Sequence, residues 1–285
     1  MFVTGAATAS LLGAALAESS GGAASTLIVL ATVSFLLSVS AGGAWAIWRG
    51  PGPVDAQVER AETVSKLAHE LKNPLMAIRG LASTAVRLFE QMSDDERSEF
   101  FRLIDEEAAR LQRVAEQSAT AMKVDAGALR YDLRDEDLGA LVEEVAWATA
   151  RGEHPIGVET RPGIGVRADR LHLSEAIANL IDNAAKFSPP DAPIEVGLHR
   201  GPDGTAVIEI ADRGPGIPDE RMEEIFRRFA RWRPAGYVET PGAGLGLFIT
   251  RAHVDAHGGK VDVVPREDGG TILRVTLPTQ GKGSG

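Results

Sequence analysis

Two asparagines and a lysine form a polar stripe on a predicted helix that is otherwise apolar. Asn179, Asn183 and Lys186 follow one another at steps of four and three residues, which places them on one helix face. Asn in a helix interior costs about 0.6 kcal/mol relative to Ala, so a solvated face, the alternative interpretation, would usually use other polar residues. An amide oxygen suits Mg²⁺ and an ammonium suits phosphate, so the stripe indicates a site for both. The buried face is expected to contain Leu173, Ile177, Leu180, Ile181 and Ala184.

A carboxylate ends a predicted strand. Ile208, Ile210 and Asp212 share one side of that strand because side chains alternate with a period of two. A buried carboxylate is costly unless a group donates hydrogen bonds to it, and an adenine amino group would do so. Gly214 and Gly216 would let the backbone turn tightly beside a planar ligand. A plain turn of the Asp-x-Gly type is the alternative.

A glycine-rich segment precedes another predicted helix. Gly242, Gly244 and Gly246 would expose backbone N–H groups at the positive end of that helix, which suits phosphates. The segment is not a dinucleotide-binding fingerprint, because no strand leads into it, and the sequence contains no Walker A string.

A histidine lies near a proline inside a long predicted helix. Residues 54–92 carry apolar side chains at steps of three and four, the pattern of a helix with one buried face. Pro74 lacks an N–H group and frees the carbonyl of Glu70, which predicts a kink beside His69. Asn73 lies on the face of His69 one turn later. A solvated histidine is the usual alternative, but a proline at this spacing favours a functional imidazole.

A second long helix follows a short loop. Ser93 and Glu96 predict a capping box at its start, and its apolar stripe runs towards residue 122. Two helices joined in this way form an αα-hairpin that does not bury both stripes by itself. A dimeric four-helix bundle is the economical solution.

Together these elements resemble the bacterial sensor histidine kinases over about residues 54–278. The motifs that carry the resemblance occur in the family's order: the H-box around His69, the N-box at 179–187, the glycine boxes at 212–216 and 242–246, and the F-box at 225–229. The resemblance implies an all-α dimerisation and phosphotransfer hairpin at residues 57–126. It also implies an ATP-binding α/β two-layer sandwich of the Bergerat type at residues 129–279.

The family's residue roles carry over to this chain as implications of the resemblance. His69 would accept the γ-phosphoryl group of ATP through a neutral ring nitrogen, and Glu70 would act as the general base. Asn73 would support dephosphorylation of a response regulator, whose aspartate also receives the phosphoryl group from His69. The nucleotide would be bound through Asn183 as the Mg²⁺ ligand, Asn179 beside it, Lys186 on the phosphates, Asp212 on adenine, and the glycines Gly214, Gly216, Gly242, Gly244 and Gly246.

Basic residues crowd near the F-box of a chain whose net charge is −10. We expect Arg228 to contact phosphate, and a solvated basic face is the alternative for each member of the group, which comprises Arg221, Arg227, Arg228, Arg231 and Arg233. The acidic balance argues against a nucleic-acid partner. The absence of cysteine from all 285 residues excludes disulfides and cysteine-based metal sites. His253 and His257 have the spacing of metal ligands, but no third ligand is evident.

The first 48 residues carry a single charge, at Glu18. Residues 26–48 are long enough to span a bilayer, with Trp45 and Trp48 as interfacial anchors. We therefore expect one transmembrane helix, a linker at 49–56, and catalytic domains on the cytoplasmic side of the inner membrane. Residues 2–17 would form a short first span, a signal-like segment without the usual basic start, or an apolar tail. The short linker leaves the input signal open.

The catalytic half alternates between strands and helices. Predicted strands cover residues 129–133, 194–199, 207–211, 261–264 and 272–277, and predicted helices cover 137–150, 173–187 and 245–257. They indicate a mixed sheet with helices on one face, and a disordered tail at 280–285. Two alternatives to a kinase are a non-signalling ATPase and a silent or phosphatase-only scaffold. The hairpin with His69 argues against the first, and the intact nucleotide residues argue against the second.

Overall fold

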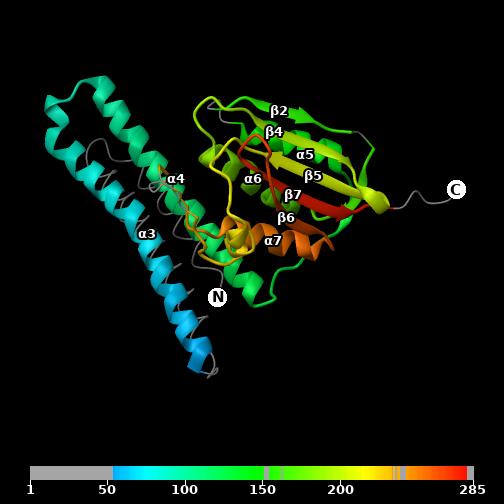
Figure 1. The fold of residues 1–285 in the computed structure, drawn as a ribbon. Helices are drawn as coiled ribbons and strands as arrows, with labels where there is room; N and C mark the ends of the chain where they lie inside the picture. The colour runs from blue at the N-terminus through cyan, green and yellow to red at the C-terminus, as the bar shows by residue number, and fades with distance from the viewer. Residues whose placement is uncertain are drawn as a thin grey trace. The chain divides into compact units, whose positions relative to one another are not determined.

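The computed structural model describes residues 54–150, 154–161, 163–232, 234, 236–237 and 242–280 (Figure 1). The predicted membrane span at 26–48, the segment 2–17 and most of the predicted disordered tail lie outside these ranges. Within them, no helix has the length and apolarity that crossing a bilayer requires. The chain divides into two compact units, Met1–Ala61 and Glu62–Gly285, and the description below concerns the second, apart from the first turns of α3.

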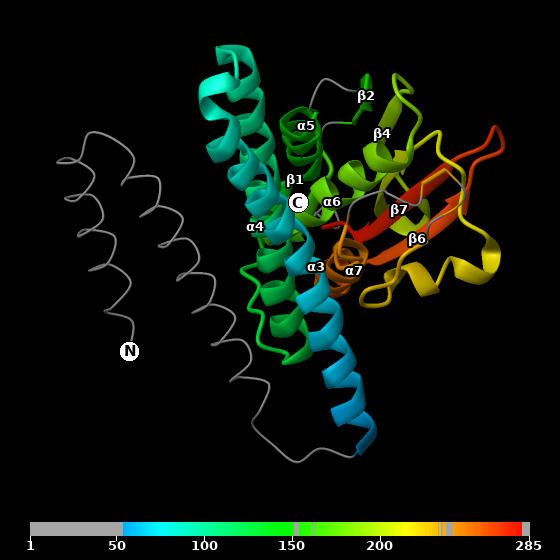
Figure 2. The same cartoon turned by 90° about the vertical axis from the view of Figure 1, so that its left-hand side faces the viewer.

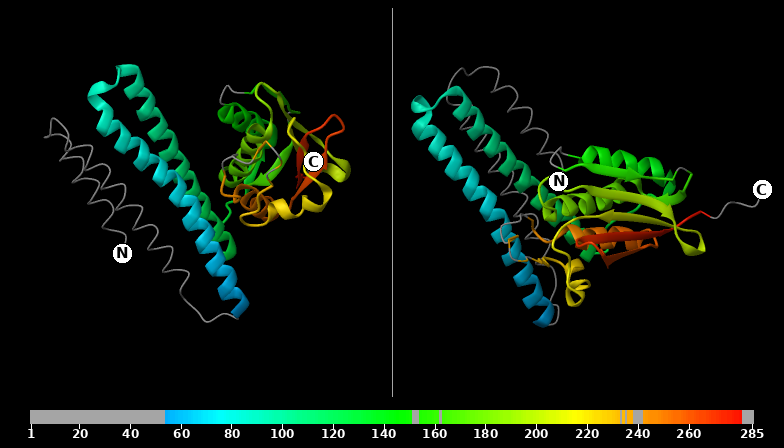
Figure 3. Two further views of the ribbon diagram at one scale, coloured as in Figure 1. Left: turned by 60° about the vertical axis from the view of Figure 1, so that its left-hand side comes forward. Right: turned by 45° about the horizontal axis from the view of Figure 1, so that its top comes forward.

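The predicted hairpin is confirmed. It consists of α3 (Val54–Leu88), a short 3₁₀ turn η1 (Phe89–Gln91) and α4 (Asp94–Asp125), which run side by side in the views of Figure 3. The capping box also forms as expected. The Ser93 hydroxyl accepts a hydrogen bond from the N–H of Glu96, and the Glu96 carboxylate accepts one from the N–H of Ser93 at 2.8 Å. Pro74 lies inside α3, which continues beyond it for more than three turns.

Five strands form the sheet of the α/β domain. They are β2 (Ile156–Glu159), β4 (Ile194–Arg200), β5 (Thr205–Ala211), β6 (Lys260–Pro265) and β7 (Thr271–Pro278), in the spatial order β2-β4-β5-β7-β6. The pair β2–β4 is parallel and the other pairs are antiparallel, so the predicted mixed sheet is confirmed.

Three helices cover one face of this sheet (Figure 2). They are α5 (Leu138–Thr149), α6 (Arg170–Phe187) and α7 (Gly246–Ala256). The predicted apolar face of α6 is confirmed, because its five members are all at most 2% exposed. Burying a Leu or Ile side chain contributes about 1.5–3 kcal/mol, so this face fixes the rotation of α6 against the sheet. The polar stripe of the helix is thereby held outside the apolar core.

The predicted strand at 129–133 is wrong. The strand β1 begins later, at Arg134–Asp137, and pairs antiparallel with β3 (Gly165–Ala168) in a separate two-stranded sheet. Side chains satisfy the polar groups of the preceding segment instead: the N–H of Asp132 donates to Asp169 at 2.8 Å, and the Tyr131 hydroxyl is 3.0 Å from Nδ1 of His253. Neither β2 nor β3 was predicted, because four residues each are too few for a clear alternation.

Candidate active site

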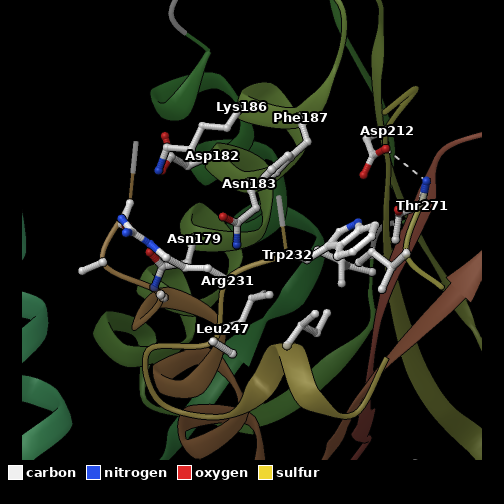
Figure 4. A pocket seen from close by; sticks show the side chains of 18 of the residues that line it. Asn179, Asp182, Asn183, Lys186, Phe187, Asp212, Arg231, Trp232, Leu247 and Thr271 are labelled. Carbon is white, nitrogen blue, oxygen red and sulfur yellow. Dashed lines mark hydrogen bonds and ion pairs between the residues drawn. The ribbon is translucent and has the colours of Figure 1, made fainter. Parts of the chain in front are cut away.

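The polar stripe of α6 forms one wall of a pocket in the α/β domain (Figure 4). Asn179, Asn183 and Lys186 all line this pocket, so the helical spacing brings the three side chains to one site. Asp212, directly after β5, lies on the opposite side together with Thr271 of β7. The other polar and aromatic side chains that line it include Gln117, Asp182, Phe187, Arg231 and Trp232.

Asp212 is held in place by backbone donors. Its side chain is buried, and Oδ1 accepts hydrogen bonds from the N–H groups of Gly214 at 2.8 Å and Thr271 at 3.0 Å. Burial raises the pKa of the Asp212 carboxyl, while these two donors act in the opposite direction. Because both of these bonds use Oδ1, Oδ2 can accept a further hydrogen bond.

Gly214 is required for close packing at this point. A Cβ atom there would lie 2.6 Å from the carbonyl oxygen of Phe187, the last residue of α6. Any larger residue would therefore push the Asp212 turn away from the helix that carries the polar stripe. Gly216 lines the pocket, and its carbonyl accepts a hydrogen bond from Nε1 of Trp232 at 3.2 Å.

The amide of Asn179 has an unused donor. Its Nδ2 atom is buried and has no hydrogen-bond partner within the described residues, whereas Oδ1 lies 3.5 Å from Nε2 of Gln117 on α4. An unpaired buried amide costs free energy, so its retention beside a pocket indicates a ligand group. Lys186 forms an ion pair with Asp182 one turn earlier, and both side chains line the pocket.

The donor set on α6 fits a nucleotide-bound Mg²⁺ ion. Mg²⁺ prefers hard oxygen ligands and is usually held by one or two protein groups together with phosphates and water. Asn179, Asn183 and Asp182 offer such oxygens on one wall. The described part of the chain contains no group of three or more His, Cys, Asp or Glu side chains that could hold a metal ion.

The second glycine segment supports the F-box as well as the pocket. Gly242, Gly244 and Gly246 line the pocket, and Gly246 begins α7. Gly244 has φ +69°, and a Cβ atom there would lie 2.5 Å from the carbonyl oxygen of Ala230. The N–H of Phe229 also donates to the carbonyl of Gly244 at 2.8 Å. Gly244 is therefore needed to seat residues 229–230 against the glycine segment.

His69 and Glu70 lie on α3 in different surroundings. His69 is exposed, whereas the Glu70 carboxylate makes a two-pronged contact with Arg231: Nη1 to Oε1 at 2.8 Å and Nη2 to Oε2 at 3.0 Å. Arg231 also donates to the carbonyl of Gly242 and lines the pocket that contains Asn183. One side chain thus contacts the residue beside His69 and borders the pocket in the α/β domain.

Arg228 and Asn73 lie outside this pocket. Arg228 forms an ion pair with Asp125 at the end of α4, and its guanidinium is 5.3 Å from the ring centroid of Phe248. The structure therefore places Arg231, rather than Arg228, along the pocket. Asn73 is exposed on α3, one turn after His69.

Two stretches of the chain match known families. Residues 59–127 match the family described as "His Kinase A (phospho-acceptor) domain". Residues 168–281 match "Histidine kinase-, DNA gyrase B-, and HSP90-like ATPase", and the order of the two matches is that of the hairpin and the α/β domain. The chain belongs to the sensor histidine kinase family. In this sensor histidine kinase, His69 lies within the first match, and Asn179, Asn183 and Lys186 lie within the second.

Relatives of this sensor histidine kinase include bacterial sensor proteins. It is 33% identical to the sensor protein SphS of Synechococcus elongatus over 80% of this chain and 57% of SphS. It is 31% identical to the sensor protein KdpD of Clostridium acetobutylicum over 78% of this chain and 25% of KdpD. The chain therefore spans only part of the length of these relatives.

A solved structure shares the fold. The histidine kinase ThkA, in complex with the response regulator protein TrrA, superimposes with a TM-score of 0.59 at 22% identity, over 79% of this chain and 64% of the other.

Sequence reasoning missed three residues that shape the site of this sensor histidine kinase. Arg231 was seen only as one member of a basic group, Trp232 was not considered, and Gln117 lies outside every motif. Gln117 had no detectable signal, because it reaches the pocket from α4, far away in the sequence.

Proposed function

We propose that this chain is an ATP-dependent protein-histidine kinase that phosphorylates His69 and passes the phosphoryl group to an aspartate of a separate response regulator. The contact between Arg231 and Glu70 carries the proposal, because it links the candidate nucleotide pocket to the residue next to the acceptor histidine. Family membership supports the same reaction class.

The pocket offers one partner for each part of Mg²⁺–ATP. Oδ2 of Asp212 would accept a hydrogen bond from the adenine amino group, and Lys186 would contact the triphosphate. Asn183 would bind Mg²⁺, with Asn179 orienting the neighbouring phosphate oxygens through its unpaired amide. The metal would neutralise charge on the triphosphate, which together with positioning is most of what phosphoryl transfer requires.

The transfer step uses the two residues on α3. A ring nitrogen of His69 bonds to the γ-phosphorus while the bond from that phosphorus to the leaving ADP oxygen breaks. The proton on the other ring nitrogen passes to Glu70. Glu70 is paired with Arg231 in the structure, so it must be released before it accepts a proton. A triphosphate in the pocket is the anion that would replace Glu70 at Arg231.

The hairpin would also serve the partner proteins. Its exposed apolar side chains favour a homodimeric bundle, since Met76, Val86 and Phe101 are 60%, 81% and 60% exposed in the single chain. Exposed Asn73 would orient water for dephosphorylation of the response regulator. ThkA, whose structure shares the fold of this chain, is solved in complex with the response regulator protein TrrA, and this supports a response-regulator partner for this chain as well.

The apolar residues 26–48 support an inner-membrane location with cytoplasmic catalysis.

One labelling experiment tests the reaction. The full chain in detergent is incubated with γ-³²P-labelled ATP and Mg²⁺, next to the His69→Gln variant. We expect acid-labile, alkali-stable label on the unmodified chain and none on the variant, which should still bind ATP. Label on both proteins would refute the acceptor assignment, and ATP hydrolysis without any protein label would point to a non-signalling ATPase.

A further inference from the structure

A second cavity adjoins His69. It is lined by Ser65, Lys66, His69 and Glu70 of α3, and by Phe229, Arg231 and Ala243 of the α/β domain. Arg231 and Ala243 also line the nucleotide pocket, so the two cavities are neighbours. The proposed reaction explains His69, Glu70 and Arg231, but it assigns no role to Ser65 or Lys66.

Helix geometry brings these two side chains close to the imidazole. Lys66 precedes His69 by three residues and Ser65 by four, and residues at these spacings have Cβ atoms about 5–6 Å apart. Lys66 is exposed and forms no ion pair with any residue that the structure describes. Its ammonium can therefore turn towards a new anion without first breaking a salt bridge.

Phosphorylation would create such an anion at this place. A phosphoryl group adds about −1.5 to −2 charges and three acceptor oxygens. The acidic side chain that lines the cavity is Glu70, and in the structure its two oxygens contact Arg231. Lys66 is a cation lining the cavity that pairs with no carboxylate among the described residues, and the Ser65 hydroxyl is a hydrogen-bond donor beside it.

We propose that this cavity holds the phosphoryl group carried by His69 after transfer, and that Lys66 stabilises the phosphorylated imidazole. The inference rests on the proposed kinase function and deepens it. Lys66 acts after the bond to phosphorus has formed, so it shifts the equilibrium between ATP with free His69 and ADP with phospho-His69.

The chain supplies a matched control. Lys72 follows His69 by three residues, is also exposed, and does not line the cavity. If the effect came only from a positive charge one turn away on α3, Lys66 and Lys72 would contribute equally. If the cavity matters, only Lys66 contributes.

The test measures an equilibrium constant in the whole 285-residue chain. The ratio of phospho-His69 to His69 is determined at fixed ATP:ADP ratios in Mg²⁺, and the end point is approached from both directions. We expect Lys66→Met to lower this ratio about two- to five-fold, the range of a solvent-accessible ion pair, and Lys66→Arg to restore most of it. Lys72→Met should leave the ratio unchanged, and high salt should reduce the Lys66 effect.

Two outcomes would overturn the inference. An unchanged ratio in Lys66→Met would remove the role of Lys66, and an equal decrease in Lys66→Met and Lys72→Met would remove the role of the cavity. Normal ATP affinity in both variants verifies that they are folded. Absence of label on the unmodified chain would instead refute the proposed kinase function, so the two failures are distinguishable.

Discussion

At the scale of single residues, Arg231 is the side chain on which the proposed reaction depends most. It contacts Glu70 with two nitrogens and borders the nucleotide pocket. We expect Arg231→Ala to lower the rate of His69 phosphorylation on the order of 100-fold, the usual cost of removing a donor to developing charge. The apparent affinity for ATP should change much less, because Asp212, Asn183 and Lys186 remain. Single-turnover phosphorylation at several ATP concentrations separates the two quantities.

Arg228→Ala provides the comparison for that prediction. Arg228 pairs with Asp125 outside the pocket, so its loss should change the rate by only a few-fold. A greater loss of rate in Arg228→Ala than in Arg231→Ala would restore the expectation drawn from the sequence.

The sequence could place the α6 residues but could not choose between the arginines. Asn179, Asn183 and Lys186 were predictable because a helix has a fixed period, and apolar neighbours on the buried face set its rotation. Arg228 and Arg231 follow the short 3₁₀ turn η4 (Glu224–Phe226), in a segment without helix or strand. Such a segment has no period from which the direction of a side chain follows.

At the scale of elements, Asp169 connects the segment after the hairpin to the α/β domain through hydrogen bonds. It is the N-cap of α6, where it accepts a hydrogen bond from the N–H of His172, and it also accepts the N–H of Asp132. Its own N–H donates to Nε2 of His257 at the end of α7. This cluster, which replaces the strand predicted at 129–133, depends on contacts between distant residues and had no local signal.

The charge of Asp169 should make this junction sensitive to acid. Burial opposes ionisation, but the N–H groups of Asp132 and His172 together with the His172 side chain outweigh it and lower the pKa of Asp169 to about 2. A carboxyl group whose pKa is lower in the folded chain than in the unfolded chain stabilises the fold at pH values above the unfolded pKa. This contribution is lost as the pH falls through the pKa of the folded state. For Asp169 it is present at pH 7 and is lost between about pH 4 and pH 2.

Asp169→Asn tests this, because Asn keeps one oxygen for the cap on the N–H of His172 but lacks both the charge and the second oxygen that accepts the N–H of Asp132. We expect the variant to lose about 2 kcal/mol of unfolding free energy at pH 7, and the difference from the unmodified chain to shrink as the pH falls below about 4. Urea-unfolding midpoints at a series of pH values measure it. A difference that stays constant down to pH 3 would assign the effect to packing rather than to charge.

At the scale of the whole molecule, the helix that carries His69 and the candidate nucleotide pocket meet within one chain. Glu70 contacts Arg231 and Asp125 contacts Arg228. An apolar cluster also joins the hairpin to the segment around α7. It is formed by Val114, Ala121, Ala243, Leu245 and Ile249, with Leu67, Leu71, Phe229 and Phe248 packed against them. An α/β domain seated in this way faces the His69 of its own hairpin.

We therefore expect phosphoryl transfer in cis within the proposed dimer. The His69→Gln chain keeps the pocket but lacks the acceptor histidine, and the Asn183→Ala chain keeps the histidine but lacks the proposed Mg²⁺ ligand. A mixed dimer of these two variants therefore has one intact pocket and one intact acceptor histidine, on different chains. Because each pocket reaches only its own hairpin, neither chain should be labelled by γ-³²P ATP. A control dimer pairs the unmodified chain with an affinity-tagged His69→Gln chain. Label on the unmodified chain alone, in dimers isolated through the tag, verifies that subunits have exchanged. Strong label on the Asn183→Ala chain would show that the pocket serves the partner's histidine, and the contact between Arg231 and Glu70 would then belong to a resting arrangement alone.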